Sequence, residues 1–159
     1  MIQPNSTWSE VGKLKMLDAT IIAFGASITC LAQAVYFEAR DQPTIGQMAV
    51  AQVVLNRVHD SRWPDTVCEV VKEGPTYSWK KDYPIKHRCQ FSFYCDGLSD
   101  VPKDKRAWNK AIRVAEEVHY TYGLSLPLLE GAVFYHATSV DPQWNRQYLL
   151  QIEDHIFYK

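Results

Sequence analysis

Residues 30–58, CLAQAVYFEARDQPTIGQMAVAQVVLNRV, decide the fold of this chain. Nearly all of them are apolar or small, and their spacing predicts two helices joined by a short turn. We expect the first helix to start near residue 18 or residue 27 and to end at Arg40, because the residue before Pro43 avoids the helical region. The stretch therefore predicts a fold that is built on helices.

The second helix, residues 48–58, is apolar almost all round, which predicts the central buried helix of the core. Before it, Thr44 and Gln47 have the spacing of a capping box with Thr44 as the N-cap. Gln52 and Asn56 are the polar exceptions, one turn apart on one face. Because a buried amide needs hydrogen-bond partners, this pair either satisfies backbone groups, which we favour, or faces a cleft.

One carboxylate, Glu38, lies on the apolar stripe of the first helix. Leu31, Ala34 and Val35 precede it at helical spacings. Burial disfavours the charged form of a carboxyl group and raises its pKa, and a carboxylic acid that is still protonated near neutral pH can act as a general acid. The alternative is an ordinary glutamate at a helix end that pairs with Arg40 or faces water.

Four further blocks follow this stretch: RWPDTVCEVV at residues 62–71, CQFSFYCDG at 89–97, FYHA at 134–137 and HIFYK at 155–159. Together with the earlier segments YFEAR and GQMAVAQVVLNRV, these blocks resemble the SleB/CwlJ type of cell-wall hydrolase, and they follow one another in the same order as in that family. That family contains spore-cortex-lytic enzymes and many phage and proteobacterial relatives. The resemblance covers roughly residues 30–159, although residues 73–88 are longer and more charged than expected between these blocks.

The resemblance implies a mostly α (α+β) single domain that is lysozyme-like or lytic-transglycosylase-like, with a small β element that includes a C-terminal hairpin. It also implies that Glu38 is catalytic and that the peptidoglycan glycan strand is cut between N-acetylmuramic acid and N-acetylglucosamine. The expected mechanism is that of a lytic transglycosylase with this single general acid/base, acting in bacterial cell lysis as an endolysin. Peptidoglycan is the expected partner, and no cofactor and no metal are expected.

Residues of the other blocks are expected to bind the substrate. The groove-lining segments of the family map onto residues 90–92 and 135–137, and a few single side chains elsewhere are further candidates. The full set of candidate substrate-binding residues is Gln90, Phe91, Ser92, Tyr135, His136, Trp144, Gln52 and Asp96. Phe91 and Trp144 can stack on a sugar face or simply pack in the core. His136, with an ordinary pKa of ~6.5, can assist proton transfer or donate a hydrogen bond. Tyr36 is expected to point away from the catalytic residue, and His155 is expected to be structural.

Three alternative functions stay open. A hydrolytic muramidase would need a second carboxylate, for which Glu73, Asp96 and Asp141 are candidates in polar surroundings. A Cys-His peptidase or amidase would use one cysteine as its nucleophile and His136 as its base. A non-catalytic wall-binding protein would bind peptidoglycan without releasing soluble fragments.

The four cysteines allow several interpretations. If the protein works outside the cytoplasm, a Cys89–Cys95 or Cys68–Cys89 disulfide would hold the loop between residues 90 and 94. Cys30 is expected to be a small residue of the core. Zinc binding by these cysteines and His87 is disfavoured, because the sequence has no C-x-x-C pair.

The remaining elements are predicted from local signals. A short helix capped by Asp65 or Thr66 should run through residue 71, followed by an irregular surface loop over residues 74–88. A third long helix should follow Pro102 and stop at Gly123. A strand is expected over residues 132–136, and a hairpin over residues 147–151 and 155–158.

The composition fits one globular domain. The 159 residues are 47% hydrophobic and 22% charged, and a net charge of −1 gives no sign of nucleic-acid binding. We divide the chain into a polar lead, residues 1–17, and a catalytic domain, residues 18–159. The lead lacks an export-signal pattern, and the apolar residues 21–35 fall short of the ~20 that span a bilayer. We therefore expect a monomer without stable membrane insertion, made in the cytoplasm and released to the wall by another route such as a phage holin.

Overall fold

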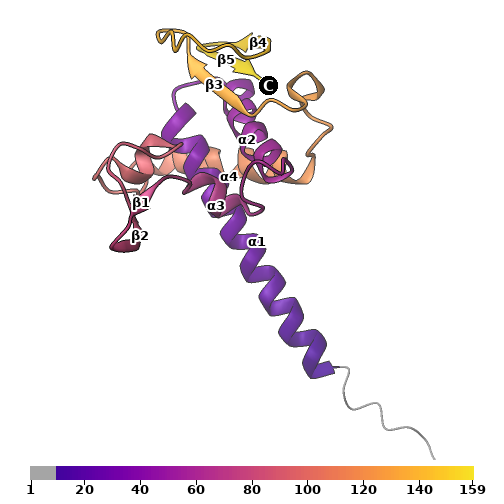
Figure 1. Cartoon of the computed structure of the whole chain (residues 1–159). Coiled ribbons are helices and arrows are strands. Elements are labelled where there is room, and N and C mark those ends of the chain that lie inside the picture. The colour runs from indigo at the N-terminus through magenta and orange to yellow at the C-terminus, as the bar shows by residue number, and fades with distance from the viewer. Residues whose placement is uncertain (1–9) are drawn as a thin grey trace, which may run out of the picture.

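The computed structural model describes residues 10–159, with side chains from residue 19 on, and shows a helical body that carries two small sheets (Figure 1). The helices are α1 (Glu10–Ala39), α2 (Thr44–Val58), α3 (Val67–Val71) and α4 (Lys105–Tyr120), with 3-10 turns η1 (Ser92–Cys95) and η2 (Pro127–Leu129). The strands are β1 (Thr76–Tyr77), β2 (Lys80–Pro84), β3 (Phe134–Ala137), β4 (Tyr148–Ile152) and β5 (His155–Tyr158). The mostly α, mixed α+β class predicted from the sequence is confirmed.

Helix α2 is the central buried helix, as predicted. One side packs against α1, α3 and α4, where Ala51, Val54 and Leu55 join the main apolar cluster. The other side meets the sheet and η2 through a second cluster that includes Ala49 and Val53. The core thus lies on both sides of one helix, which is why that helix is apolar almost all round.

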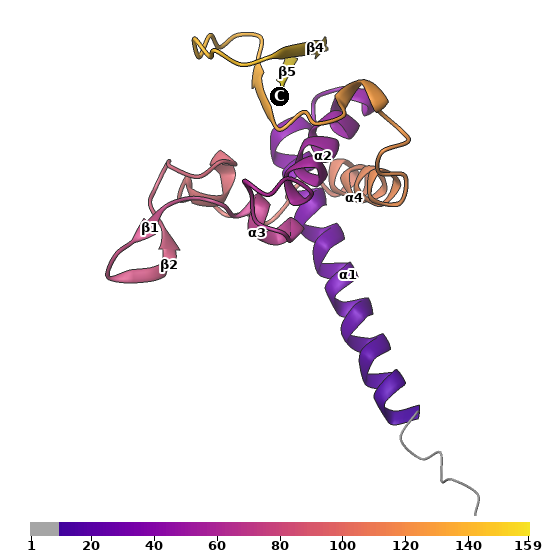
Figure 2. The same ribbon diagram turned by 45° about the vertical axis from the view of Figure 1, so that its right-hand side comes forward.

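Helix α1 starts at Glu10, well before the predicted start, and its first turns project away from the body (Figures 1 and 2). Ile21 and Ile22 on this part are 66% and 72% exposed, whereas Leu31 and Val35 are fully buried. Of the predicted lead, residues 1–9 lie outside the described part and residues 10–17 belong to α1. Because the helix continues to Ala39, residues 19–39 are long and apolar enough to cross a membrane by length and composition, unlike the shorter stretch considered above. The last turns of this stretch nevertheless lie in the core of the domain.

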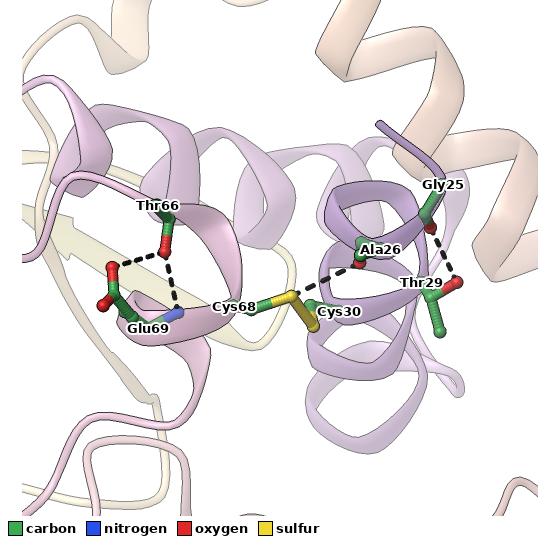
Figure 3. Close-up of a disulfide and its surroundings, with 7 residues drawn as sticks. All are labelled: Gly25, Ala26, Thr29, Cys30, Thr66, Cys68 and Glu69. Atoms are coloured by element: carbon green, nitrogen blue, oxygen red, sulfur yellow. Dashed lines mark hydrogen bonds between the residues drawn. A yellow bond between two sulfur atoms is a disulfide. The ribbon is translucent and has the colours of Figure 1, made fainter. Parts of the chain in front are cut away.

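The helix ends show where local signals hold and where they fail. Thr44 is the first residue of α2 and not its cap; Pro43 is the N-cap, and Gln47 donates instead to the Gln42 carbonyl oxygen at 3.0 Å. The predicted capping box is therefore wrong, because the glutamine satisfies the turn rather than the helix end. In α3, Thr66 caps as predicted by accepting the Glu69 N–H at 3.3 Å (Figure 3).

The small sheets correct one prediction and confirm another. Residues 76–84 form a two-stranded hairpin, β1–β2, where an irregular loop was expected, and its register shifts between Thr76 and Tyr77. The C-terminal hairpin β4–β5 and the strand β3 are present, in the order β3-β5-β4 with antiparallel pairing. The three-stranded sheet lies at the end of the molecule opposite to the projecting part of α1 (Figures 1 and 2).

Two disulfides use all four cysteines. Cys89–Cys95 is one of the two predicted pairs. Cys30 lies in the core as predicted, but it is also bonded to Cys68 with an S–S distance of 2.06 Å, a pairing that was not predicted and that ties α1 to α3 (Figure 3). Because no cysteine is free, none can supply the thiolate nucleophile of a Cys-His peptidase, and that alternative is contradicted.

Candidate active site

Glu38, in the last turn of α1, faces a groove of about 760 Å³ between the helical body and the sheet. The groove is lined by side chains from α1, α2, the loop before η1, the sheet and the segment before β4; they are Glu38, Arg57, Gln90, Phe91, Ser92, Phe134, Tyr135, His136, Ala137, Val140, Pro142, Trp144, Arg146 and His155. Burial raises the pKa of the Glu38 carboxyl group, while a hydrogen bond from Tyr135 and the charge of Arg57 lower it in part. Glu38 is the only carboxylate in this lining.

Tyr135 on β3 holds the Glu38 carboxyl group. Its hydroxyl donates to Glu38 Oε2 at 3.2 Å, and its ring packs against Phe157 and His155 on the neighbouring strand β5. Burial, followed by the nearby Glu38 charge, raises the pKa of the Tyr135 hydroxyl well above its ordinary value. The phenol therefore stays protonated and remains a donor to the carboxyl group over the whole physiological range.

Arg57, in the last turn of α2, is a buried cation beside the groove. Its side chain is 4% exposed, its Nε donates to the Val133 carbonyl oxygen at 2.8 Å, and its guanidinium lies over the Trp63 ring at 4.1 Å. Burial lowers the pKa of Arg57 to about 10, so the group is still charged at neutral pH. The sequence analysis did not single out Arg57; the available signal was one basic residue inside the apolar run VAQVVLNRV.

The loop between the cysteines of the Cys89–Cys95 disulfide forms one wall of the groove. Gln90 and Ser92 are exposed there, as a substrate-binding role requires. Phe91 between them is only 1% exposed and lies 5.4 Å from the Arg57 guanidinium. Phe91 therefore packs in the core beneath Arg57, and its ring faces are not available for stacking on a sugar.

The opposite wall carries His136 and Trp144. The two ring nitrogens of His136 lie 2.9 Å from the Ala137 carbonyl oxygen and 2.9 Å from the Tyr158 hydroxyl. Nδ1 therefore donates to the carbonyl, and Nε2 accepts from the phenol. Trp144 is 39% exposed and packs edge-to-face against His136. Of the two aromatic candidates, it is Trp144 that presents a ring to the groove.

Two of the proposed substrate-binding residues lie elsewhere. Gln52 is 2% exposed and donates to Asn56 Oδ1 at 3.2 Å, inside the body and away from the groove lining. Asp96 lines a separate pocket of about 580 Å³ beside Arg40 and Tyr36. Tyr36 points away from Glu38, as predicted, and its hydroxyl accepts the Lys103 and Asp104 N–H groups.

The candidate second carboxylates do not line the groove. Asp141 borders an adjoining pocket of about 520 Å³ that shares His136 and Trp144 with the groove. Glu73 lies in the segment after α3; burial raises its pKa and the charge of Arg57 lowers it in part, so its surroundings are less polar than the sequence suggested. Among the described residues, no group of three or more His, Cys, Asp or Glu side chains is arranged to hold a metal ion.

The chain belongs to the cell wall hydrolase family, because the Cell Wall Hydrolase (Hydrolase_2) domain matches residues 41–158. Glu38 lies just before the matched range. The chain is 52% identical over 58 residues to the spore cortex-lytic enzyme of Halalkalibacterium halodurans. The matched stretch covers 36% of this chain and 18% of that enzyme. It is 50% identical over 58 residues to the spore cortex-lytic enzyme of Bacillus subtilis, covering 36% of this chain and 19% of that enzyme. These matches thus span about a fifth of the length of each relative.

Solved structures extend the similarity to most of the chain. The catalytic domain of the Bacillus cereus SleB protein matches with a TM-score of 0.58 and 26% identity, over 84% of this chain and 89% of that one. The catalytic domain of the germination-specific lytic transglycosylase SleB from Bacillus anthracis matches with a TM-score of 0.57 and 27% identity, over 84% and 93%. The described fold is therefore that of SleB catalytic domains.

Proposed function

We propose that this protein cleaves the glycan strand of peptidoglycan between N-acetylmuramic acid and N-acetylglucosamine, as a lytic transglycosylase in which Glu38 is the single general acid/base. The observation that carries the proposal is the half-buried Glu38 side chain, whose carboxyl group is the only carboxylate lining an open groove and has its pKa raised by burial. The names of the relatives, spore cortex-lytic enzyme and lytic transglycosylase, support the same chemistry.

In this mechanism Glu38 starts as the neutral acid, which burial favours. It donates its proton to the glycosidic oxygen as the bond from that oxygen to the anomeric carbon of N-acetylmuramic acid breaks. The ionised carboxylate then accepts the proton of the sugar's own 6-hydroxyl, whose oxygen bonds to the anomeric carbon. A 1,6-anhydro product forms, Glu38 is protonated again, and no water is consumed.

The other groove residues support binding in this proposal. Gln90 and Ser92 offer hydrogen bonds to acetamido and hydroxyl groups from one wall, and the Trp144 ring offers a stacking face from the other. Tyr135 keeps the acid in place through its hydrogen bond to Oε2. His136, fixed between Tyr158 and a backbone carbonyl, orders this wall of the groove.

We also propose that the protein works outside the cytoplasm. Disulfides persist in oxidising compartments and are rare in the cytosol, and both disulfides here lie in the catalytic domain. Mass spectrometry of protein alkylated at harvest tests this: the functional pool should carry no alkylated cysteine. The monomeric state and an endolysin role stay predictions.

Mass spectrometry of fragments from purified peptidoglycan tests the proposed reaction. The wild-type protein should release 1,6-anhydro-muropeptides, and Glu38→Gln should release none. Glu69→Gln, which neutralises an exposed glutamate outside the groove, is the matched control and should behave as wild type. Reducing muramic ends would instead establish a hydrolytic muramidase, and fragment-free binding would establish a wall-binding protein.

A further inference from the structure

The β1–β2 hairpin has no part in the proposed mechanism. It spans residues 76–84 and projects from the helical body on the side away from the three-stranded sheet (Figures 1 and 2). None of these residues belongs to either apolar cluster of the described core, and a two-stranded hairpin is only marginally stable by itself. Core packing therefore does not account for its side chains.

The tip of the hairpin exposes aromatic rings. Trp79, in the turn between the strands, is 76% exposed, and Tyr83 on β2 is 55% exposed. The Trp79 ring packs against Tyr77, with the ring centroids 5.3 Å apart and an angle of 35° between the planes. This contact restricts the tryptophan and leaves most of its surface to solvent. Turn chemistry does not explain the residue either, because two-residue hairpin turns favour Gly, Asn and Asp.

The same segment carries an excess of positive charge. Residues 76–88 hold four exposed cations against one aspartate, a net charge of +3 in a chain whose net charge is −1; the cations are Lys80, Lys81, Lys86 and Arg88. None of the four forms an ion pair with a carboxylate of the described residues. The Lys80 ammonium group lies 4.0 Å from the centre of the Tyr83 ring. Cations and exposed rings are thus presented together on one hairpin.

The base of the hairpin is fixed to a wall of the groove. The Gln90 N–H donates to the Glu73 carbonyl oxygen at 2.9 Å, and the Gln90 side chain lines the groove. Gly74 lies so close to Cys89 that a Cβ would come within 2.9 Å of the Cys89 Cα atom. The hairpin therefore cannot shift at its base without moving this wall, and a polymer bound at the hairpin is held near the groove.

We propose that this hairpin is a second peptidoglycan-binding surface outside the groove, where Trp79 stacks on a sugar ring and Lys80 and Lys81 pair with carboxylates of the stem peptides. This inference rests on the proposed function, which makes peptidoglycan the substrate. The C–H groups of a sugar ring complement the negative face of an aromatic ring, and free carboxylates complement the cations. A second contact with a long polymer raises the local concentration of glycan at the groove.

The composition of the hairpin favours a glycan over a membrane surface. Anionic lipid also attracts Trp, Tyr and Lys. Residues 76–84, TYSWKKDYP, contain no Leu, Ile, Val, Phe or Met that would enter the acyl chains, and they include the anionic Asp82. The hairpin offers ring faces and cations without an aliphatic wedge, which matches a sugar polymer that carries carboxylates.

Co-sedimentation with insoluble peptidoglycan tests the aromatic contact, in the Glu38→Gln background so that the polymer is not cut. Trp79→Ala should weaken binding by about tenfold or more. Trp79→Tyr, which keeps a ring, should retain most of the affinity. Tyr120→Ala, which removes a 72% exposed ring from α4 outside the groove, is the matched control and should bind like its parent.

The same assay tests the charged contact. The double variant Lys80→Gln, Lys81→Gln should bind roughly 2- to 10-fold more weakly at low salt, and the difference should shrink at high salt because ions screen exposed charges. The control is Lys105→Gln, Arg106→Gln, which removes two exposed cations from α4 and should leave binding unchanged.

Cleavage kinetics separate a binding role from a structural one. On insoluble peptidoglycan, Trp79→Ala should raise KM and leave kcat near the wild-type value. Short soluble glycan fragments, which fill the groove alone, should be cleaved at the wild-type rate. A substitution that disturbed the groove would instead lower the rate on both substrates.

Unchanged co-sedimentation of folded Trp79→Ala, or an equal loss of rate on both substrates, would overturn the inference. Binding to phosphatidylglycerol vesicles that depends on Trp79, while peptidoglycan binding does not, would also overturn it. Should Trp79→Ala not fold, the lysine variant decides by the same comparison. Each of these results leaves the proposed function standing, since that function fails only if Glu38→Gln still releases anhydro-muropeptides or the wild-type protein releases none.

Discussion

Two buried polar clusters start from neighbouring residues of α2 and differ in almost every respect. The inner cluster comprises Gln52, Asn56 and Tyr122. Asn56 donates to the Leu129 and Ala132 carbonyl oxygens, each at 2.8 Å, and its oxygen accepts from Gln52 and from the Tyr122 hydroxyl. The Asn56 amide is thus fully hydrogen-bonded, and every member of this cluster is an uncharged side chain at neutral pH.

The groove cluster comprises Glu38, Arg57 and Tyr135, and the hydrogen bond from the Tyr135 hydroxyl to Glu38 Oε2 joins two of its members. Its groups are ionisable, and burial displaces the pKa of each from its ordinary value: upward for Glu38 and Tyr135, downward for Arg57. In the inner cluster Gln52 Oε1 is buried without a hydrogen-bond partner, but the central Asn56 amide is fully hydrogen-bonded and no member is charged, which favours a fixed fold. Incompletely paired buried charges are more costly and concentrate at sites of chemistry. The comparison assigns the inner cluster to stability and the groove cluster to function.

The largest expected effect comes from Glu38→Gln. Loss of the general acid should reduce the cleavage rate by at least ~10²-fold, measured by release of soluble fragments from peptidoglycan. Burial raises the pKa of Glu38 in the folded state, so the protonated group contributes stability that is fully present below its unfolded pKa and is lost as the pH rises through its folded pKa. The variant should therefore melt at the same temperature as wild type or higher at pH 7. A large fall in melting temperature would contradict the division between the clusters.

Removing the Cys30–Cys68 disulfide should produce the largest effect on stability alone. The bond closes a loop over a sequence separation of 38 and ties α1 to α3, which gives roughly 2–4 kcal/mol of stabilisation. Urea unfolding of the double Cys→Ala variant measures the loss. Below the unfolding transition, the pH profile of cleavage by this variant should match that of the wild type. A shifted profile would mean that the disulfide also fixes the positions of Glu38, Arg57 and Tyr135.

Asn56→Ala should destabilise the protein without changing its chemistry. The substitution leaves two buried carbonyl oxygens, the Gln52 amide and the Tyr122 hydroxyl without their partner, and each unsatisfied buried group costs about 1–3 kcal/mol. We expect a loss of at least ~2 kcal/mol in urea unfolding. The cleavage rate per folded molecule at low temperature should stay near the wild-type rate. A ~10²-fold loss of that rate would contradict the assignment of the inner cluster to stability rather than to catalysis.

Tyr135→Phe should have the smallest effect. It removes the hydrogen bond that lowers the pKa of Glu38, so that pKa should rise. The alkaline limb of the pH–rate profile should therefore move to higher pH. A limb that stays in place would show that Tyr135 only packs against the sheet.

Local patterns in the sequence predicted the helical elements well. The apolar periodicity of residues 30–58 indicated that α2 is the buried centre and that Glu38 lies at a buried position of α1, since periodicity reports which face of a helix is covered. The C-terminal hairpin and the Thr66 cap were also readable from neighbouring residues. The capping box failed because the Gln47 side chain donates to the Gln42 carbonyl oxygen of the preceding turn, and the spacing of two residues does not show which partner a side chain takes.

Tertiary structure decided how segments remote in sequence meet. Periodicity shows that a face is covered and does not show by what, so the Cys30–Cys68 bond and the position of Phe91 beneath Arg57 were not predictable. The sequence by itself determined the helices, the family resemblance and the choice of Glu38 as the candidate acid. Only the packing of α1, α2 and β3 around one groove placed Arg57 and Tyr135 near that acid, because Coulomb interactions and hydrogen bonds depend on distances that the order of residues does not fix.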